Sequence, residues 1–429
     1  MKLRRIRPED VRHLDRQPVS RERLEAAAEI VEAIRSEGVA AARRYAEQFG
    51  EIREGGAMVV DRTQLVAALE GIPRADRDLL ERTADRIETF ARAQREALSE
   101  ATIEIPGGHV GHRIAPVGRA GCYAPGGRYP LPSSVLMTAV TARVAGVKSV
   151  VVASPRPLPV TLAAAAVAGA HEVLTLGGAH AIAVLAVGID GFEPCDLVVG
   201  PGNTWVTAAK QLVFGTVGID MLAGPSELVI LADDNADAAT VAADLLAQAE
   251  HDPDALPVLV STSEELVASV DAEIECQLET LPTRAIAEQA MVNGFAVVVP
   301  DLETAASICG RLAPEHLQVM TERPVDVASQ LDCWGGLFIG DGSAEVLGDY
   351  GAGPNHTLPT GGVARYRGGL SVFDFLRVRT WMEIDNLSEA GETVEDSIAL
   401  ARLEGLEAHA RAAELRLKER IRASSRSNV

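Results

Sequence analysis

The run Ser149-Val-Val-Val-Ala153 indicates a short strand that is buried on both faces. A helical pattern at residues 134–145 precedes it, and another at 160–169 leads to the next apolar run, Glu172-Val-Leu-Thr-Leu176. The alternation continues with a helix, a strand and a helix, at residues 179–187, 196–199 and 203–214. Short apolar strands that alternate with helices of about ten residues predict a parallel sheet with helices on both faces.

A second α/β series follows toward the C-terminus. Its expected strands lie at residues 228–231, 258–261, 296–299 and 336–339. The two series share no sequence repeat, but both alternate short apolar strands with helices, and this predicts two sheet domains. Earlier in the chain, residues 21–49 and 74–98 show helical periodicity. Residues 103–114 indicate a hairpin that turns at Gly107-Gly108.

The C-terminal region differs in composition and periodicity from the two α/β series. Residues 387–423 are rich in Ala, Glu and Arg and show helical periodicity without a strand pattern. They predict a terminal pair of helices. This pair could pack on its own chain or on a partner subunit, and the pattern favours neither interpretation.

The composition disfavours some classes of partner. The 429 residues correspond to two or three domains at about 150 residues each. With 40 Lys and Arg against 61 Asp and Glu, the net charge is −21, which argues against nucleic acid and against an anionic membrane surface. No apolar run reaches the roughly 18 residues of a membrane span, and no secretory signal is present. We therefore expect a soluble, cytoplasmic protein with no nucleic-acid or membrane partner.

The five cysteines, Cys122, Cys195, Cys276, Cys309 and Cys333, lie far apart in the sequence. No Cys-x-x-Cys is present, so neither a disulfide framework nor a thiolate zinc site is indicated.

Two short segments pair residue types that carry chemistry. Gln248 and His251 are three residues apart at the end of a predicted helix, so both side chains share one face and could hold one ion. Glu315 and His316 are adjacent after another predicted helix, where one could act as a general acid and the other as a general base. The spacing of Gln248 and His251 also arises by chance in most proteins, and the Glu315 and His316 segment by itself favours a turn with two solvated polar residues.

The loop at residues 348–362 is rich in Gly and Pro and carries Asp349 and His356. Such loops are usually functional or disordered. Its oxygen and nitrogen donors suit Zn²⁺ or Mn²⁺. In the C-terminal helical region, Glu404 and His409 taken by themselves fit an ordinary helix surface.

Two further loops resemble phosphate or cofactor cradles. Residues 124–134, Ala-Pro-Gly-Gly-Arg-Tyr-Pro-Leu-Pro-Ser-Ser, precede a helix that Ser133 or Ser134 could cap, and residues 200–204, Gly-Pro-Gly-Asn-Thr, precede another. Backbone N–H groups at a helix N-terminus favour an anion. Neither loop has the third glycine of the Gly-x-Gly-x-x-Gly fingerprint, so a nucleotide site and a plain capping turn both remain open.

Taken together, five segments resemble the histidinol dehydrogenase family in order and spacing. They are residues 218–227, 248–252, 313–317, 348–360 and 404–409, and the resemblance extends from about residue 20 to 415. The family oxidises L-histidinol through L-histidinaldehyde to L-histidine, the last step of histidine biosynthesis. It reduces two NAD and uses one zinc ion per subunit.

The resemblance implies an α/β fold with two incomplete Rossmann-like parallel-sheet domains of aldehyde-dehydrogenase-like type. To these it adds an N-terminal helical arm and a small C-terminal helical domain. The expected division is an arm (1–20), a first α/β domain with most metal and catalytic residues (21–121 and 226–375), an NAD-binding α/β domain (122–225) and a helical tail (376–429). The tail would pack on the partner subunit of a domain-swapped homodimer.

The resemblance also assigns roles residue by residue. The catalytic pair would be Glu315 and His316, and the zinc ligands would be Gln248, His251, Asp349 and His409, the last from the other subunit. Substrate contacts would come from Ser226, Gln248, His251, His316, Asp349, His356, Glu404 and His409. NAD contacts would come from Tyr123, His180 and Asn203, with His180 standing where the family usually has Gln.

Three competing functions are weaker. A family paralogue could oxidise another small alcohol, such as a sulfopropanediol, but a sulfonate should prefer a basic residue over Glu404, and Ser226 also favours histidinol. A zinc hydrolase using His251 and Glu315 lacks His-Glu-x-x-His and leaves the loop from Tyr123 to Ser134 unexplained. A binding protein without catalysis would not need so many ionisable groups at one site.

Overall fold

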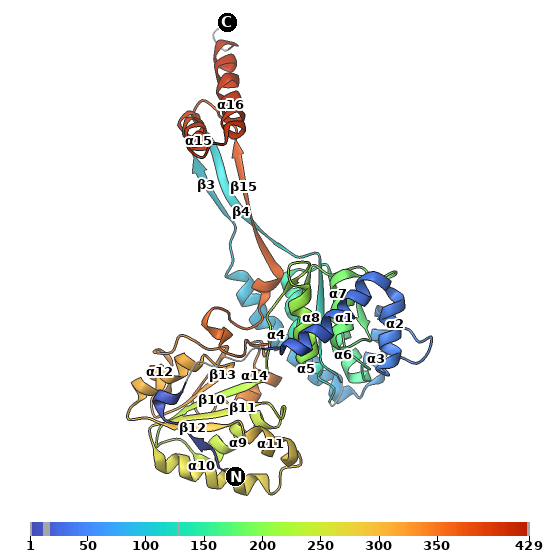
Figure 1. Cartoon of the computed structure of the whole chain (residues 1–429), viewed down its shortest axis with the longest axis vertical. Coiled ribbons are helices and arrows are strands. Elements are labelled where there is room, and N and C mark those ends of the chain that lie inside the picture. The colour runs from blue at the N-terminus through green and yellow to red at the C-terminus, as the bar shows by residue number, and fades with distance from the viewer. Residues whose placement is uncertain (1, 12–17, 127–128, 427–429) are drawn as a thin grey trace. The chain divides into compact units, whose positions relative to one another are not determined.

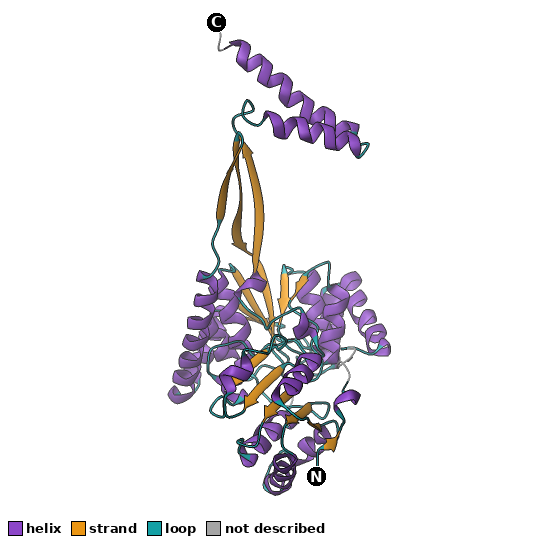
Figure 2. Cartoon of the chain, turned by 90° about the vertical axis from the view of Figure 1, so that its left-hand side faces the viewer, coloured by secondary structure: helices purple, strands orange, loops and turns teal. Residues whose placement is uncertain are grey.

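The computed structural model describes residues 2–11, 18–126 and 129–426 of the chain. Clustering of contacts divides it into two compact units. The first unit comprises Met1–Arg95 and Val117–Phe375, and the second comprises Glu96–Pro116 and Leu376–Val429. The first unit contains two six-stranded sheets, and the second contains a three-stranded sheet and two helices (Figures 1 and 2).

One sheet of the first unit has the strand order β2-β7-β6-β5-β8-β9. All neighbours are parallel except β2 and β7. The strands are β2 (Val59–Asp61), β5 (Arg119–Tyr123), β6 (Ser149–Ala153), β7 (Glu172–Leu174), β8 (Leu197–Val199) and β9 (Gly218–Ile219). The helices between them are α5 (Pro132–Ala145), α6 (Pro159–Ala168), α7 (Gly178–Val187) and α8 (Thr204–Val213). The predicted alternation of parallel strands and helices is confirmed.

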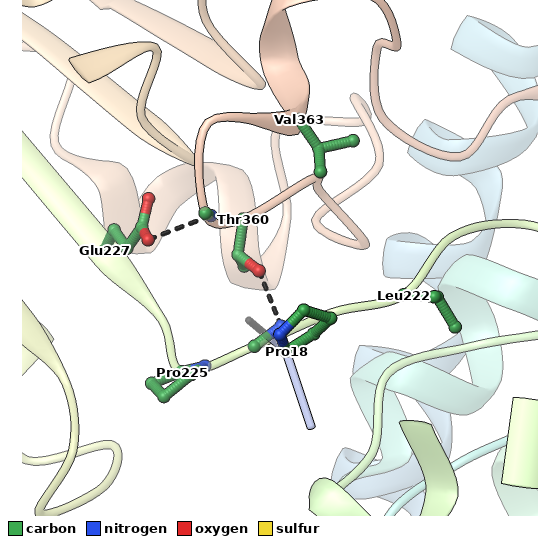
Figure 3. A pocket seen from close by; sticks show the side chains of 8 residues that line it. Pro18, Leu222, Pro225, Glu227, Thr360 and Val363 are labelled. Carbon is green, nitrogen blue, oxygen red and sulfur yellow. Dashed lines mark hydrogen bonds between the residues drawn. The ribbon is translucent and has the colours of Figure 1, made fainter. Parts of the chain in front are cut away.

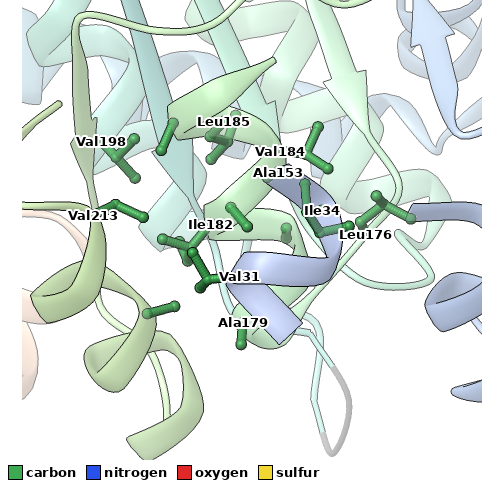
Figure 4. Close-up of a cluster of buried hydrophobic side chains, with 14 of the residues drawn as sticks. Val31, Ile34, Ala153, Leu176, Ala179, Ile182, Val184, Leu185, Val198 and Val213 are labelled. Carbon is green, nitrogen blue, oxygen red and sulfur yellow. The ribbon is translucent and has the colours of Figure 1, made fainter. Parts of the chain in front are cut away.

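A buried cluster on this sheet also contains side chains from the N-terminal helices α1 (Arg21–Glu37) and α2 (Val39–Gln48). Figure 4 shows Val31 and Ile34 of α1 beside Leu176 and Ile182. Burying a side chain of this size stabilises the fold by about 1.5–3 kcal/mol. The strand β2 follows and pairs with β7, while α3 (Arg62–Gly71) packs on α6.

These contacts correct one expected boundary. Residues 21–121 were expected to belong with residues 226–375. Instead, β2 is an edge strand of the sheet of the 122–225 region, and the helices α1 and α2 pack against that sheet. An amphipathic helix shows in its sequence which face is apolar, but not which sheet will cover that face.

The other sheet of the first unit has the order β1-β12-β11-β10-β13-β14, and every pair is parallel. Its strands are β1 (Arg4–Arg5), β10 (Glu227–Ala232), β11 (Leu256–Ser261), β12 (Phe295–Val298), β13 (His316–Met320) and β14 (Gly336–Ile339). Along β10, Leu228 and Ile230 belong to one buried cluster and Val229 and Leu231 to another. Because alternate residues face opposite sides of a strand, both faces of this sheet are buried.

The helices of this half are α9 (Ala238–Ala249), α10 (Glu264–Leu278), α11 (Arg284–Met291), α12 (Leu302–Leu312), α13 (Pro324–Ala328) and α14 (Glu345–Tyr350). A long helix, α4 (Arg74–Glu96), and short 3-10 turns at Pro8–Asp10, Val363–Arg365 and Val372–Phe375 complete the first unit. The strand β13 was not predicted. Its sequence, His316-Leu-Gln-Val-Met320, interrupts the apolar run with His and Gln.

The second unit is an antiparallel sheet in the order β15-β4-β3, with α15 (Gly391–Leu403) and α16 (Glu407–Arg426). The strands are β3 (Ala101–Ile105), β4 (Gly108–Pro116) and β15 (Leu376–Ile384), so the predicted hairpin and the helical pair are confirmed. The hairpin turns at Pro106-Gly107, one residue earlier than predicted, because Gly108 already pairs with Ile105. The expected purely helical tail is wrong at β15, and the hairpin belongs with the tail rather than with the first α/β domain. No helix in the described part of the chain is both long and apolar enough to cross a membrane.

Candidate active site

The candidate active site lies at the amino ends of β10 and β13. Glu227 is the first residue of β10, and His316 is the first residue of β13 and pairs with Leu228. Glu315 immediately precedes His316. The two were expected in a loop. Their position at the beginning of a buried strand fixes them more firmly than a loop would.

The ring of His316 is held in one orientation. Its side chain is buried, and Nδ1 lies 2.9 Å from the carbonyl oxygen of Glu227. A carbonyl can only accept, so Nδ1 carries the hydrogen and donates it. The other ring nitrogen, Nε2, is buried and has no hydrogen-bond partner among the described residues. In the neutral ring, Nε2 is therefore the free proton acceptor.

Glu315 is buried beside it. Its Oε2 accepts a hydrogen bond from the backbone N–H of Glu227 at 2.9 Å and lies 3.6 Å from Nδ1 of His316. Burial raises the pKa of Glu315 to about 8, against a lowering by His316. A carboxyl group with a pKa near neutrality can both hold and accept a proton in the working pH range.

A second group of side chains can hold a metal ion. One ligand atom from each of His251, Glu345 and Asp349 lies within 4.8 Å of the others. His251 follows α9 after its C-cap residue, whereas Glu345 and Asp349 both lie on α14. Nε2 of His251 is 3.8 Å from Oδ2 of Asp349 and 4.0 Å from Oε1 of Glu345. Asp349 was expected in a loop and lies in a short helix instead.

Sequence reasoning missed Glu345. The available signal was its spacing, because residues four apart on a helix share one face and Asp349 is four residues farther on. The loop prediction for this region hid that signal.

The residues fit a divalent metal ion. Both polar side-chain atoms of Gln248 and both carboxylate oxygens of Glu345 are buried without a hydrogen-bond partner in the described part of the chain. Leaving such a group unsatisfied costs about 1–3 kcal/mol. Burial also lowers the pKa of His251, which favours the neutral imidazole that binds metals. Oxygen and nitrogen donors without thiolate are suited to zinc.

His356 lies next to Asp349 but bonds to its backbone. Its Nδ1 donates to the carbonyl oxygen of Asp349 at 3.0 Å, and its Nε2 lies 3.4 Å from the hydroxyl of Ser134 on α5. Burial lowers the pKa of His356. Asn355 donates to the carbonyl of Met137, so two contacts attach this loop to the other α/β half.

Ser226 immediately precedes β10, and its two neighbours in the chain, Pro225 and Glu227, line a small cavity (Figure 3). The cavity encloses about 20 Å³, room for roughly one water molecule. Thr360 accepts from the backbone of Gly224, and Gly361 donates to Glu227, so the loops on both sides of Ser226 are held together. Glu227, the residue after Ser226, is thus bonded to the loop at Gly361 and also accepts the hydrogen bond from His316.

Glu404 and His409 lie in the second compact unit. Glu404 is the C-cap residue of α15, His409 lies in the first turn of α16, and both are exposed. Within the first unit the structure brings together His251, Asp349 and His356, and the pair Glu315 and His316.

Of the expected cofactor residues, Tyr123 ends β5, Asn203 follows β8 and His180 follows β7. The order β7-β6-β5-β8-β9 reverses between β5 and β8, and ligands of open α/β sheets bind outside the carboxyl ends at such a point. Tyr123 ends β5, and its hydroxyl accepts from the backbone of Gly178 at 3.1 Å. Gly200, after β8, has φ +116°, and a Cβ there would collide with the carbonyl of Tyr123.

His180 and Asn203 already have partners in the chain. Nε2 of His180 lies 2.7 Å from the carboxylate of Glu51, and both side chains are buried. Oδ1 of Asn203 accepts from the backbone of Trp205 and Val206, which makes Asn203 the N-cap of α8. Capping of α5 by Ser133 or Ser134 was wrong, because the helix begins at Pro132 after Leu131. Gly127 and Arg128 of that loop lie outside the described residues.

The fold and the site define an α/β protein with two mainly parallel sheets. One sheet carries the expected cofactor residues Tyr123 and Asn203 at its switch point, and the other carries a buried centre of histidine and carboxylate side chains. The sequence profile of the family described as histidinol dehydrogenase matches residues 15–417. The chain belongs to this family.

Individual relatives agree. Histidinol dehydrogenases of Parasynechococcus marenigrum and Thermus thermophilus are each 45% identical to the chain, over 90% of it and over 90% and 93% of their own lengths. The crystal structure of histidinol dehydrogenase from Elizabethkingia anophelis superposes with a TM-score of 0.90 at 30% identity, covering 97% of this chain and 98% of that one. The predicted family, the α/β fold and an NAD-dependent oxidoreductase function are confirmed, and the alternatives are disfavoured.

Proposed function

We propose that the chain oxidises L-histidinol through L-histidinaldehyde to L-histidine, with reduction of two NAD, as the last step of histidine biosynthesis. The observation that carries this proposal is the pairing of a fixed proton acceptor, Nε2 of His316, with the metal-compatible cluster of His251, Glu345 and Asp349. Oxidation of an alcohol needs such an acceptor for the hydroxyl proton.

Gln248, His251 and Asp349 would hold the zinc ion together with His409 of the partner subunit. A bound zinc ion would supply a Lewis acid and a template for the imidazole and amine nitrogens of the substrate. Ser226, His356 and Glu404 would make the remaining substrate contacts. The negative charge of Glu404 suits a cationic amino alcohol.

His316 would accept the hydroxyl proton at Nε2 while hydride leaves the carbinol carbon. Its Nδ1 hydrogen bond to Glu227 keeps Nε2 pointed at the same place in both oxidation steps. Glu315 would then take a proton from the water that adds to the aldehyde, and His316 would act again in the second oxidation. Burial of both groups excludes bulk water from these proton transfers.

NAD would supply the hydride acceptor, contacted by Tyr123, His180 and Asn203. Because Glu51 engages Nε2 of His180, Nδ1 is the ring atom left for another contact, and it is buried without a partner among the described residues. Asn203 has its amide nitrogen left, because its oxygen caps α8. The position of all three after β5, β7 and β8 supports the assignment.

The tail is proposed to pack on a second copy in a domain-swapped homodimer. Several leucines of α15, α16 and the turn between them are exposed: Leu400, Leu403, Leu406 and Leu415. Exposed apolar groups gathered on one pair of helices favour a protein partner over solvent. We also propose a cytoplasmic location, which suits an NAD-dependent biosynthetic enzyme.

The substrate assignment is tested with zinc-loaded protein and NAD, by comparing L-histidinol with a sulfopropanediol. NADH should form with histidinol and not with the sulfonated alcohol. NADH from the sulfonated alcohol alone would support the paralogue instead. Hydrolysis of an amide or ester substrate without NADH would support the zinc hydrolase.

Replacing Glu315 with glutamine (Glu315→Gln) should slow aldehyde oxidation more than alcohol oxidation, by at least about tenfold. With its pKa raised to about 8 by burial, Glu315 gains the carboxylate form needed to activate water as pH rises through 8. The rate of histidinaldehyde oxidation should therefore rise over that range in the parent protein and stay flat in the variant. Stopped-flow NADH formation from each substrate separates the two steps, and equal losses would contradict this role.

A further inference from the structure

A pair of opposite charges is buried beneath the loop that follows β8. Lys210 of α8 and Asp220, which follows β9, form an ion pair, and only 2% of each residue is exposed. Among the described residues, no other Lys or Arg is buried. A buried ion pair is weak evidence for stability, because well-packed apolar residues would stabilise the fold as well. The contacts of the pair indicate what it holds in place.

The pair bonds to both backbone polar groups of Gly200. Oδ2 of Asp220 accepts from the N–H of Gly200 at 2.7 Å, and Nζ of Lys210 donates to its carbonyl oxygen at 2.9 Å. Lys210 can reach back to this carbonyl because helical side chains lean toward the N-terminus of their helix, which the loop precedes. Oδ1 of Asp220 also accepts from the N–H of Met221 at 2.6 Å, so both oxygens of the carboxylate are held.

Gly200 lies at the switch point of its sheet, next to the expected cofactor residues. A Cβ on it would lie 2.0 Å from the carbonyl oxygen of Tyr123, the last residue of β5. Asn203, the N-cap of α8, is three residues farther along the loop. Because the pair fixes Gly200 at both polar groups, it also fixes the point from which the loop to Asn203 starts.

The helix α8 also contacts the segment that leads to the catalytic residues. Asp220 and Met221 begin the connection from β9 to β10, and Ser226 ends it. The hydroxyl of Thr207 on α8 donates to the carbonyl oxygen of Ala223 in this connection at 2.8 Å. The cofactor loop and the segment before Ser226 are therefore bonded to the same helix.

We propose that Lys210 and Asp220 are positioning residues for NAD, which hold the loop at residues 200–203 in its cofactor-binding conformation. The inference rests on the proposed function, in that it takes Tyr123 and Asn203 as NAD contacts. Both charged side chains are buried and act through the loop rather than on the cofactor. Without the pair, the loop would adopt the binding conformation for only a fraction of the time. The apparent affinity for NAD would fall by that fraction.

The test removes both charges, in the full-length double variant Lys210→Met/Asp220→Asn. Removing one partner would leave an uncompensated buried charge, whereas removing both avoids that cost, so the Tm should stay close to that of the parent protein. The KM for NAD at saturating L-histidinol should rise about tenfold or more, and the Kd for NADH, measured by its fluorescence, should rise equally. The kcat at saturating NAD should stay within about threefold, because bound NAD selects the competent loop.

Arg119→Met/Glu172→Gln is the matched control. Arg119 and Glu172 form an ion pair at the opposite, amino edge of the same sheet, where they begin β5 and β7. Its removal shows whether the loss of any ion pair from this sheet weakens NAD binding, and the KM for NAD should stay at the parent value. An equal rise in KM in both double variants would overturn the proposal. So would a parent-like KM for NAD in Lys210→Met/Asp220→Asn.

Two single variants complete the test. Asp220→Asn removes the charge that pairs with Lys210 but keeps one oxygen for a backbone N–H, so the KM for NAD should rise by about threefold or more. This variant decides the matter if the double variant does not fold, and an unchanged KM would then overturn the proposal. Asn203→Ser keeps the helix cap and removes the amide nitrogen. Parent-like NAD affinity in Asn203→Ser would contradict the proposed NAD contact, whereas the role of the pair is read from its own variants.

Discussion

Replacing His316 with asparagine (His316→Asn) should lower NADH formation from L-histidinol by about 10²–10⁴-fold. The asparagine amide can take the place of Nδ1 and still donate to the carbonyl of Glu227, while the acceptor nitrogen Nε2 is lost. The anchor is kept and the base is removed. The expected effect is therefore on kcat, with little change in zinc content or in Tm.

A matched control uses a histidine outside the site. His171 is exposed, and its Nδ1 accepts from the backbone of Val150, a role that an asparagine oxygen can take over. His171→Asn should keep near-parent activity in the same assay. Near-parent activity in His316→Asn as well would contradict the assignment of the base.

Mixing two inactive variants should restore activity if the partner subunit completes the metal site. Asp349→Asn and His409→Ala should each lose zinc retention and fall to background activity, because each removes a proposed ligand. In a mixed dimer, one of the two sites combines the intact Asp349 of the His409→Ala subunit with the intact His409 of the Asp349→Asn subunit. Random pairing should then recover about a quarter of the parent activity.

The position of the two residues makes this test sharp. Asp349 lies in the first compact unit and His409, exposed on α16, lies in the second, so the two substitutions fall in different units of the chain. Co-refolding or co-expression with two different tags isolates the mixed dimer. A mixed dimer without activity would place His409 in its own subunit's site, and tight zinc in His409→Ala would remove it from the ligand set.

Most of the α/β framework could be predicted from local pattern. The run Ser149–Ala153 forms β6 with the predicted bounds because a strand covered on both faces must be apolar throughout. The same rule failed at β13, where the side-chain amide nitrogen of buried Gln318 donates to Asp244, a residue 74 positions away. The apolar-run criterion cannot find a strand whose polar groups are paired by tertiary contacts.

The candidate site, too, could be predicted only where local sequence pattern carries the information. The motifs placed His251, Asp349 and the pair Glu315 and His316 from spacing and resemblance, but the lack of partners around Glu345 exists only in the folded chain. The pairing of His180 with Glu51, 129 residues apart, likewise has no local signal. Spacing identifies which groups could act, whereas burial and partners decide which of them are left free to do so.

The most direct test of the proposed function is the stoichiometry of the complete reaction. Zinc-loaded protein is incubated with excess NAD and a limited amount of L-histidinol, and NADH is measured by absorbance while L-histidine is measured by chromatography. Two successive oxidations at one site predict about two NADH for each histidine, with no accumulation of free aldehyde. One NADH per histidinol with the aldehyde as product, or no NADH at all, would contradict the account.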